Sequence, residues 1–208
     1  QHFLGTSISS DDTGNIVAIG SPGLNGRVQC YVYSSNAWTN YGTTIATSES
    51  NALFGQSVSL NSAGTRLCIG APDGQIVGTS KFGQVRIYNY SAELGWVQLG
   101  QNFSGELNAS KLGTSVALSG DGNTFIAGAP GYNGNIGRVY IRRITPTGTD
   151  PVGDSITGTA VNQQCGLKVA INTSGTIIAV ASNGNSTAGV VRVYSLVGNN
   201  WVQLGGDI

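Results

Sequence analysis

Charge is scarce in this sequence: only 10% of its 208 residues are charged, with ten Lys and Arg against ten Asp and Glu. A nucleic-acid-binding surface needs clustered cations that neutralise phosphates, so nucleic acid is not an expected partner. The sequence also offers no polybasic segment that an anionic membrane surface would attract. No apolar run approaches the length of a membrane-spanning helix, and we therefore expect no direct membrane insertion.

Residues suited to catalysis are equally rare. The single histidine, His2, is next to the first residue, where a Ser–His arrangement would depend on the chain end. Glu49, Glu93 and Glu106 occupy unrelated positions, so no carboxylate pair for glycoside cleavage stands out. The glycine-rich segment 131–137 resembles a phosphate loop only by its glycine count, because no helix is expected after it. We expect a non-catalytic protein without a cofactor.

Methionine is absent and cysteine is sparse. Cys30, Cys68 and Cys165 each lie in an apolar, strand-like stretch and match no zinc spacing, which favours buried free thiols over a disulfide. Because the sequence opens at Gln1 and contains no Met, we expect a segment or processed product of something longer. The low charge and high Ser, Thr, Asn and Gly content favour an extracellular or surface-exposed location.

What the sequence does contain is an internal repeat. Four segments with the pattern of LGTSVALSGDGNTFIAGAP begin at Leu4, Phe54, Leu112 and Cys165. Sixteen residues separate these starts from Gly20, Gly70, Gly128 and Ala181. The spacing varies only further along each unit, between the second and third strands, as expected for a fixed scaffold with free loops.

Each unit predicts four strands. Val58 and Leu60 alternate with Ser57 and Ser59, which is the period of a strand with one buried face. A shared glycine between the first two strands indicates a tight hairpin with one left-handed residue; it is Gly14, Gly64, Gly122 or Gly175. We therefore predict an all-β, β-propeller-type array of four four-stranded antiparallel blades in a single domain, 1–208. The expected blades are 1–48, 49–106, 107–159 and 160–208, as a small ring or as part of a longer propeller.

The segments FGQSVSL…CIGAP (54–72) and LGTSVAL…IAGAP (112–130) resemble the FG-GAP repeat of integrin α-chain propellers. The repeat glycines that carry this resemblance are Gly5, Gly55, Gly113 and Gly166. The resemblance implies a β-propeller and a role in adhesion or recognition. Calcium-binding repeats of that family carry an acidic loop between the first two strands, and the short turns here lack its ligands, so no metal is expected.

Tryptophan recurs at one repeat position, as Trp38, Trp96 and Trp201. We interpret it as structural, packing the outer strand against a neighbour, because it belongs to a repeat-defining strand. The alternative is an aromatic platform for sugars on each blade, which would make the chain a carbohydrate-binding propeller.

The leading hypothesis is a module for adhesion, protein–protein recognition or structural assembly, with protein or glycan partners on a surface and neighbouring blades or domains. Contacts are expected from the variable loops 73–82 and 131–136. The ligand-binding candidates are Asp73, Gln75, Lys81, Tyr132, Asn133 and Trp96. The sequons at Asn108, Asn172 and Asn185 are glycosylation candidates, because they fall in predicted turns or loops.

Overall fold

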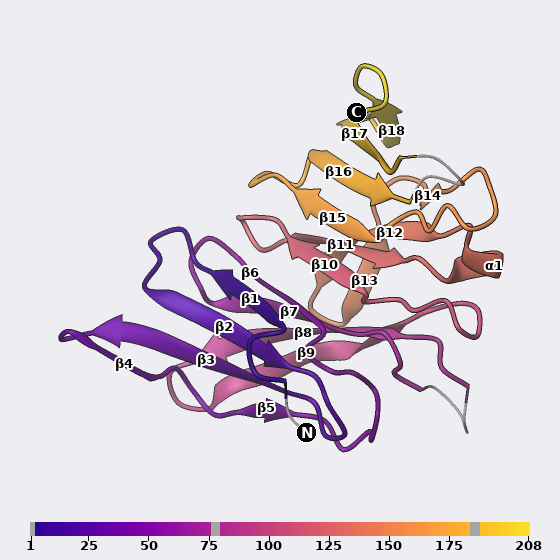
Figure 1. Ribbon diagram of the computed structural model, residues 1–208. Helices are drawn as coiled ribbons and strands as arrows, with labels where there is room; N and C mark the ends of the chain where they lie inside the picture. Colours follow the sequence, from indigo (N-terminus) through magenta and orange to yellow (C-terminus); the bar gives the residue numbers. More distant parts are fainter. Residues whose placement is uncertain (1–2, 76–79, 184–187) are drawn as a thin grey trace.

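The computed structural model describes residues 3–75, 80–183 and 188–208, and nearly all of their regular structure is β-strand (Figure 1). Blade 1 contains β1 (Ser7–Ser10), β2 (Ile16–Ser21), β3 (Arg27–Ser34), β4 (Ala37–Asn40) and β5 (Ile45–Ala46). Blade 2 contains β6 (Ser57–Leu60), β7 (Arg66–Ala71), β8 (Gln84–Ser91) and β9 (Gly95–Ser104). Blade 3 contains β10 (Ser115–Leu118), β11 (Thr124–Ala129), β12 (Arg138–Thr145), β13 (Gly148–Pro151) and β14 (Ile156–Thr157). Blade 4 contains β15 (Lys168–Ile171), β16 (Ile177–Ser182), β17 (Val190–Val197) and β18 (Asn200–Gln203).

The four sheets are antiparallel and their strands follow chain order, so the predicted all-β architecture of four four-stranded blades is confirmed. The short strands β5 and β14 are continuations of the outer strands, since each pairs with the third strand of its own blade. Each of the four outer strands departs from regular pairing at a glycine with positive φ. These glycines are Gly42, Gly100, Gly153 and Gly205. Such a residue lets one strand bulge and then rejoin the same partner.

The predicted hairpin glycines Gly14, Gly64, Gly122 and Gly175 all have positive φ, between 65° and 75°. Side chains within the turns complete these hairpins. Asn61 Oδ1, for example, accepts hydrogen bonds from the backbone N–H groups of Thr65 and Arg66, and Asn172 Oδ1 does the same for Thr176 and Ile177. In blade 1, Asp11 Oδ1 accepts the N–H of Ile16. Burial raises the pKa of Asp11, but these turn hydrogen bonds outweigh it and keep the pKa below its ordinary value.

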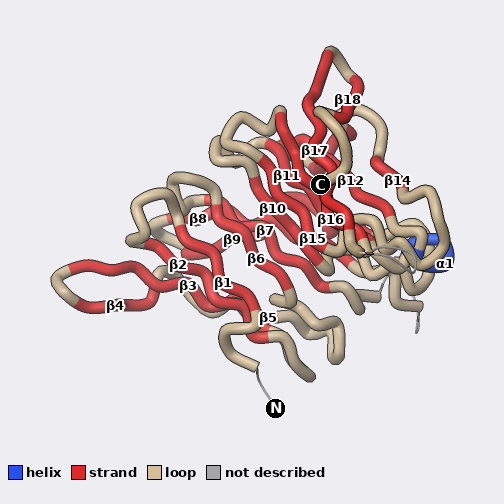
Figure 2. Tube along the Cα trace, turned by 45° about the horizontal axis from the view of Figure 1, so that its top comes forward, coloured by secondary structure: helices blue, strands red, loops and turns tan. Residues whose placement is uncertain are grey.

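The blades stack in sequence through three hydrophobic clusters, one between each pair of neighbours. Both views show blades 1 and 4 at opposite ends of an open fan (Figures 1 and 2). The inner blades are consequently covered on both sides: β7 and β11 are almost wholly buried, whereas β2 and β16 are only partly buried. The second strand of a blade is therefore buried on both faces in the inner blades alone.

All three cysteines are free and buried, as predicted. Burial raises the pKa of the Cys30 thiol to about 12 and also raises the pKa values of Cys68 and Cys165. The segment 131–137, expected to be a loop, contains the single turn α1 (Tyr132–Asn135). Asn133 and Gly134 have φ of 47° and 68° in this turn, so it is not a regular helix.

Candidate functional site

Each blade meets the next through a close backbone approach that requires glycine. A Cβ atom at Gly20 would lie 2.1 Å from the carbonyl oxygen of Gly55 in blade 2. The equivalent distances at the next two junctions are 2.1 Å and 1.9 Å, for Gly70 with Gly113 and Gly128 with Gly166. The repeat glycines therefore bring two sheets together at main-chain distance.

A serine beside each of these glycines adds a hydrogen bond across the junction. Ser7 is paired with Gly20 in the β1–β2 ladder, and its hydroxyl donates to the Gly55 carbonyl oxygen at 2.8 Å. Ser57 donates in the same way to Gly113, also at 2.8 Å. At the third junction Ser115 Oγ accepts the N–H of Val169 at 3.1 Å.

The repeated tryptophan ties the outer strand of one blade to the preceding blade. Trp96 is 7% exposed, and its Nε1–H donates to the Tyr41 carbonyl oxygen at 2.9 Å. Trp201 donates to the Val152 carbonyl oxygen at 2.7 Å. Both indoles pack between blades, so Trp96, a predicted ligand-binding candidate, presents no free ring face for a sugar. Trp38 has no preceding blade in this structure and is 51% exposed.

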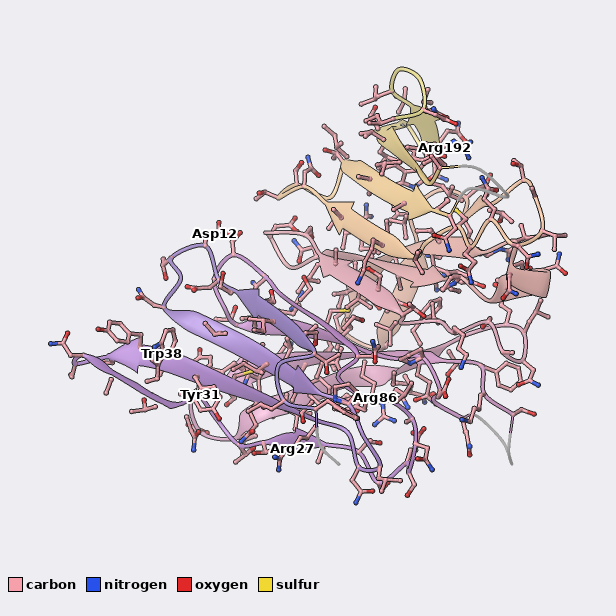
Figure 3. The ribbon with its side chains drawn as sticks, in the orientation of Figure 1. Asp12, Arg27, Tyr31, Trp38, Arg86 and Arg192 are labelled. Carbon is pink, nitrogen blue, oxygen red and sulfur yellow. The ribbon has the colours of Figure 1, made fainter. Side chains whose placement is uncertain are left out.

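Trp38 belongs to an exposed apolar surface that we call the rear face of blade 1, formed by Leu4, Ile8, Val17, Ile19, Tyr31, Tyr33 and Trp38. Leu4 is 60% exposed and Ile8 64%, although their counterparts Phe54 and Val58 in blade 2 are 0% and 7% exposed. A groove of about 320 Å³ on this face is lined by Val17, Ile19, Tyr31 and Trp38. Tyr31 and Trp38 are labelled in Figure 3, at the end of the fan opposite Arg192.

The predicted loop candidates Asp73 and Lys81 pair with each other. The Lys81 ammonium lies 3.0 Å from one Asp73 carboxylate oxygen, and the Lys111 ammonium contacts the other. Burial raises the pKa of Asp73, but the hydrogen bonds and charges of the two lysines outweigh it and hold the pKa below its ordinary value. The carboxylate is therefore already bound by one lysine of the loop and by one from the connection to blade 3. Residues 76–79 of the predicted loop lie outside the described residues.

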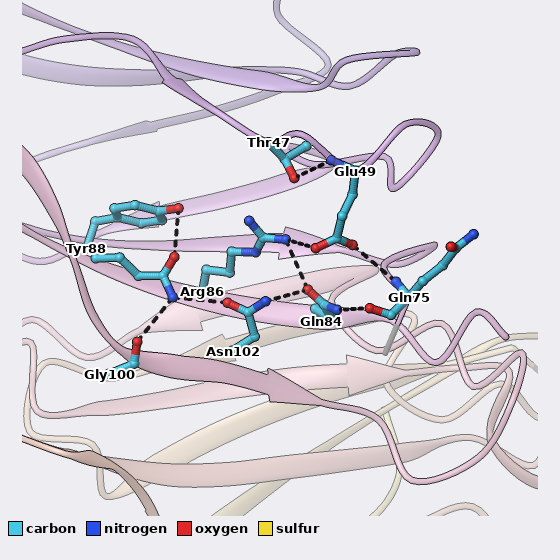
Figure 4. A network of polar contacts seen from close by, with 9 residues as sticks. Thr47, Glu49, Gln75, Gln84, Arg86, Tyr88, Gly100 and Asn102 are labelled. Carbon is cyan, nitrogen blue, oxygen red and sulfur yellow. Dashed lines mark hydrogen bonds and ion pairs between the residues drawn. The ribbon is translucent and has the colours of Figure 1, made fainter. Parts of the chain in front are cut away.

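Gln75 joins a polar network that spans blade 2 and its connection to blade 1 (Figure 4). Its backbone N–H donates to Glu49 at 3.2 Å, and its carbonyl oxygen accepts a hydrogen bond from Gln84 Nε2. The Arg86 guanidinium binds the Glu49 carboxylate and donates to Gln84 Oε1 at 3.1 Å. Asn102 donates to the same Gln84 oxygen at 2.9 Å.

This network borders an open polar cavity of about 550 Å³. Its lining residues are Glu49, Gln75, Gln84, Gln98, Gly100, Gln101, Asn102 and Ser104. Amide and carboxylate groups of this kind can hydrogen-bond a polyhydroxylated ligand. Most of the same groups already bond one another, so the cavity is a preassembled polar surface.

Tyr132 and Asn133 lie far from this cavity in sequence, on the blade 3 turn α1. The Arg138 guanidinium lies 3.9 Å from the Tyr132 ring centroid, which is cation–π geometry, and it also pairs with Glu106 at 2.8 Å. The structure thus brings Asp73 together with Lys81, and Tyr132 with Arg138, but it does not gather the predicted candidates into one site.

The glycosylation candidates differ in their surroundings. Asn108 is exposed, and its Oδ1 accepts the Lys81 N–H at 2.9 Å. The Asn172 amide nitrogen donates to Ser174 and Thr176, so a glycan there would disturb the turn. Asn185 lies outside the described residues.

Sequence reasoning missed the rear face of blade 1 and the Arg86–Glu49 pair. The repeat alignment held a usable signal for the first, because Leu4 and Ile8 align with residues that need a neighbouring blade to be buried. Nothing in the sequence identified Glu49 as the partner of Arg86, which lies thirty-seven residues away.

In the described part of the chain, no helix has the length and apolarity that a membrane crossing requires. The same residues contain no group of three or more His, Cys, Asp or Glu side chains placed to hold a metal ion.

No family model matches the chain, and no curated protein matches it in sequence. Solved structures do resemble it. A candidate 6-phosphogluconolactonase from Bacteroides uniformis has a TM-score of 0.66 at 10% identity, over 98% of this chain and 56% of that one. TolB from Acinetobacter baumannii has a TM-score of 0.56 at 10% identity, over 95% of this chain and 42% of that one. The β-propeller domain of Cps50 (Swd1) from Myceliophteria thermophila has a TM-score of 0.60 at 15% identity, over 94% of this chain and 54% of that one.

At these identities the likeness shows the fold alone, and it confirms the predicted β-propeller-type array. The chain spans about half the length of the solved structures that it matches.

Proposed function

We propose that this chain is a non-catalytic β-propeller module of the FG-GAP type, exposed outside the cell or on its surface, that serves adhesion, protein recognition or structural assembly. The observation that carries the proposal is the rear face of blade 1. Leu4, Ile8 and Trp38 are each more than half exposed on this face, and an apolar groove lies between Val17, Ile19, Tyr31 and Trp38. Contiguous exposed apolar surface rimmed by polar residues is typical of protein–protein contact sites.

The state of the acidic side chains supports a non-catalytic role. Several carboxylates bind a neighbouring cation: Glu49 binds Arg86, Asp73 binds two lysines, Glu106 binds Arg138 and Asp207 binds Arg192. The Arg192 hydrogen bonds lower the pKa of Asp207 to about 2. The lowered pKa values of Asp73 and Asp207 do not suit general acids, which need raised ones.

The location is tested with an antibody raised against the chain. We expect it to stain intact, unpermeabilised cells that produce the protein, and staining only after permeabilisation would contradict a surface location. Hydrolysis of 6-phosphogluconolactone by the purified chain would contradict the non-catalytic role.

The recognition role is tested with Ile8→Lys on the rear face. We expect this variant to lose binding to purified extracellular proteins on an array while its melting temperature stays unchanged. The matched control is Val97→Lys, since Val97 is 42% exposed on β9 and lies outside the rear face. Equal binding by Ile8→Lys and the wild type would count against the rear face as the contact surface.

The second candidate is a carbohydrate-binding propeller, which the polar cavity of blade 2 favours. Gln98 Nε2 donates to Asn102 Oδ1 at 3.0 Å, and Gln98 Oε1 accepts from Tyr88 at 3.3 Å. A glycan array separates the candidates. Binding that is lost in Gln98→Ala but kept in Gln203→Ala, the equivalent change in blade 4, would support the lectin function, and no glycan binding by the wild type would reject it.

A further inference from the structure

The two ends of the fan differ in their ability to accept another blade. We call the side of a blade that meets the next blade its forward face. On blades 1 to 3 the junction on this face depends on a cross-strand Ser–Gly pair: Ser7 with Gly20, Ser57 with Gly70, and Ser115 with Gly128. The glycine admits the carbonyl oxygen of the next blade, and the serine hydroxyl bonds across the same junction.

Blade 4 carries a different pair at this position, Lys168 with Ala181. A Cβ atom at the preceding three glycines would lie 1.9–2.1 Å from the next blade's carbonyl oxygen, so the Ala181 methyl group occupies the space that this oxygen needs. Lys168 replaces the small hydroxyl with a long charged side chain. A following blade with the same geometry is therefore excluded, and so is blade 1 of the same chain or of another copy.

The rear face of blade 1 has the opposite character, because its receiving backbone is already formed. Gly5 has φ of 86°, close to 87° at Gly55 and 90° at Gly113, which both receive a preceding blade. The Gly5 N–H donates to the Gly20 carbonyl oxygen at 3.1 Å, as the Gly55 N–H does to Gly70. The Gly5 carbonyl thus has the same local backbone as the carbonyls that contact a Ser–Gly pair.

The side chains of the rear face also match those of the internal junctions. Leu4 corresponds to Phe54, which is fully buried against blade 1, and Trp38 corresponds to Trp96, whose indole reaches a carbonyl oxygen of the preceding blade. The groove between Val17, Ile19, Tyr31 and Trp38 is exposed on blade 1, whereas the equivalent part of blade 2 is covered by blade 1.

We propose that the rear face of blade 1 seats one further blade of the same repeat, on the N-terminal side of the array, with a forward Ser–Gly pair and an outer-strand carbonyl oxygen for Trp38. Blade 4 ends the array through Lys168 and Ala181. This inference rests on the proposed assembly function and names the occupant of the same surface. It predicts that a further blade packs at the blade 1 end of the array and not at the blade 4 end, a difference that the fold alone does not require.

The first test gives blade 4 the Ser–Gly pair through which the other blades pack against the next blade. The double variant Lys168→Ser, Ala181→Gly restores the Ser–Gly pair. A second glycine also approaches the next blade closely, since a Cβ atom at Gly26 would lie 2.3 Å from the Phe54 carbonyl oxygen, and blade 4 already has the equivalent glycine, Gly189. We expect the wild type to sediment as a monomer and the double variant to self-associate, with blade 4 of one copy seated on blade 1 of the next. Adding Ile8→Lys should return the double variant to a monomer. Self-association of the wild type, or a monomeric double variant at millimolar concentration, overturns the proposal.

The second test places a blade in front of blade 1. A copy of residues 4–53, with Trp38→Phe inside the copy, precedes residues 4–208, so that Leu53 joins Leu4 as it joins Phe54 in the native chain. We expect hydrogen exchange of the native Trp38 indole N–H to slow by about tenfold or more, because docking buries it. The matched control carries Ser7→Lys and Gly20→Ala in the copy, and equal protection of Trp38 in this control overturns the proposal.

The outcomes for this inference and for the proposed function can be told apart. Absence of surface staining or of extracellular protein partners rejects the proposed function without affecting the sedimentation of the double variant. A monomeric double variant rejects the inference about the occupant, while the staining and binding results stand.

Discussion

The indole N–H of Trp96 reaches across a blade boundary and donates to the carbonyl oxygen of Tyr41 at 2.9 Å. The Tyr41 and Tyr90 rings stack beside it with centroids 3.8 Å apart, and both rings contact the Trp96 indole edge to face. Because this cluster joins residues of two blades, the equivalent tryptophan has no such partner in blade 1. The two positions therefore give a direct comparison of a docked and an undocked copy of one residue.

Trp96→Ala should destabilise the chain by about 3 kcal/mol or more, since it removes a buried aromatic side chain and leaves a cavity between blades. Trp38→Ala should cost under about 1 kcal/mol, because the Trp38 side chain is half exposed. Urea denaturation followed by circular dichroism measures both changes. Equal losses at the two positions would contradict the role of Trp96 in blade packing.

Gly70→Ala should destabilise the chain by about 2 kcal/mol or more, because its Cβ atom would lie 2.1 Å from the Gly113 carbonyl oxygen. The two backbones can relieve this contact only by separating blades 2 and 3. Gly148→Ala is the matched control, since a Cβ atom at Gly148 meets nothing within 4 Å. The shift in urea midpoint should appear in the first variant and be near zero in the second.

Glu49→Ala should destabilise the chain by about 2 kcal/mol, because the Arg86 side chain, only 10% exposed, would lose its ion-pair partner. The cost stays below that of a fully buried pair, since the Glu49 side chain is 30% exposed. The double variant Glu49→Ala, Arg86→Met should recover much of the loss, because no buried charge then remains. Denaturation midpoints of the four combinations form a double-mutant cycle, and strictly additive losses would exclude the coupling.

The stability that the Asp73 carboxylate contributes should be lost in acid. Its native pKa lies below the ordinary carboxyl value of 3.8, so its contribution to stability is complete above that value and is lost as the pH falls through the native pKa. The wild type should therefore lose stability more steeply than Asp73→Asn below about pH 4. Unfolding free energies measured across this range test the difference. Parallel pH profiles for the two proteins would show that the lysine contacts of Asp73 do not stabilise the fold.

The repeat, its strands and its turns could be predicted because they depend on local properties of the chain. The alternation of Val58 and Leu60 with serines is the pattern of any half-buried strand. The turn at Gly64 needs a residue with positive φ whatever surrounds it. The ligand candidates were less predictable. Asp73 was predicted as a ligand-binding candidate in a variable loop, but two lysines bind its carboxylate, one of them from the connection to blade 3. Such pairings depend on how loops distant in sequence meet.

The sequence by itself determined that the same four-stranded sheet occurs four times, since strand period and glycine placement are properties of each segment alone. Only the tertiary structure decided which copies of an equivalent residue are buried: Phe54 is enclosed whereas Leu4 is exposed, and Trp96 is bonded whereas Trp38 is not. The physical reason is that a side chain on one face of a blade is removed from water only by the blade beside it, and the fan is open at both ends.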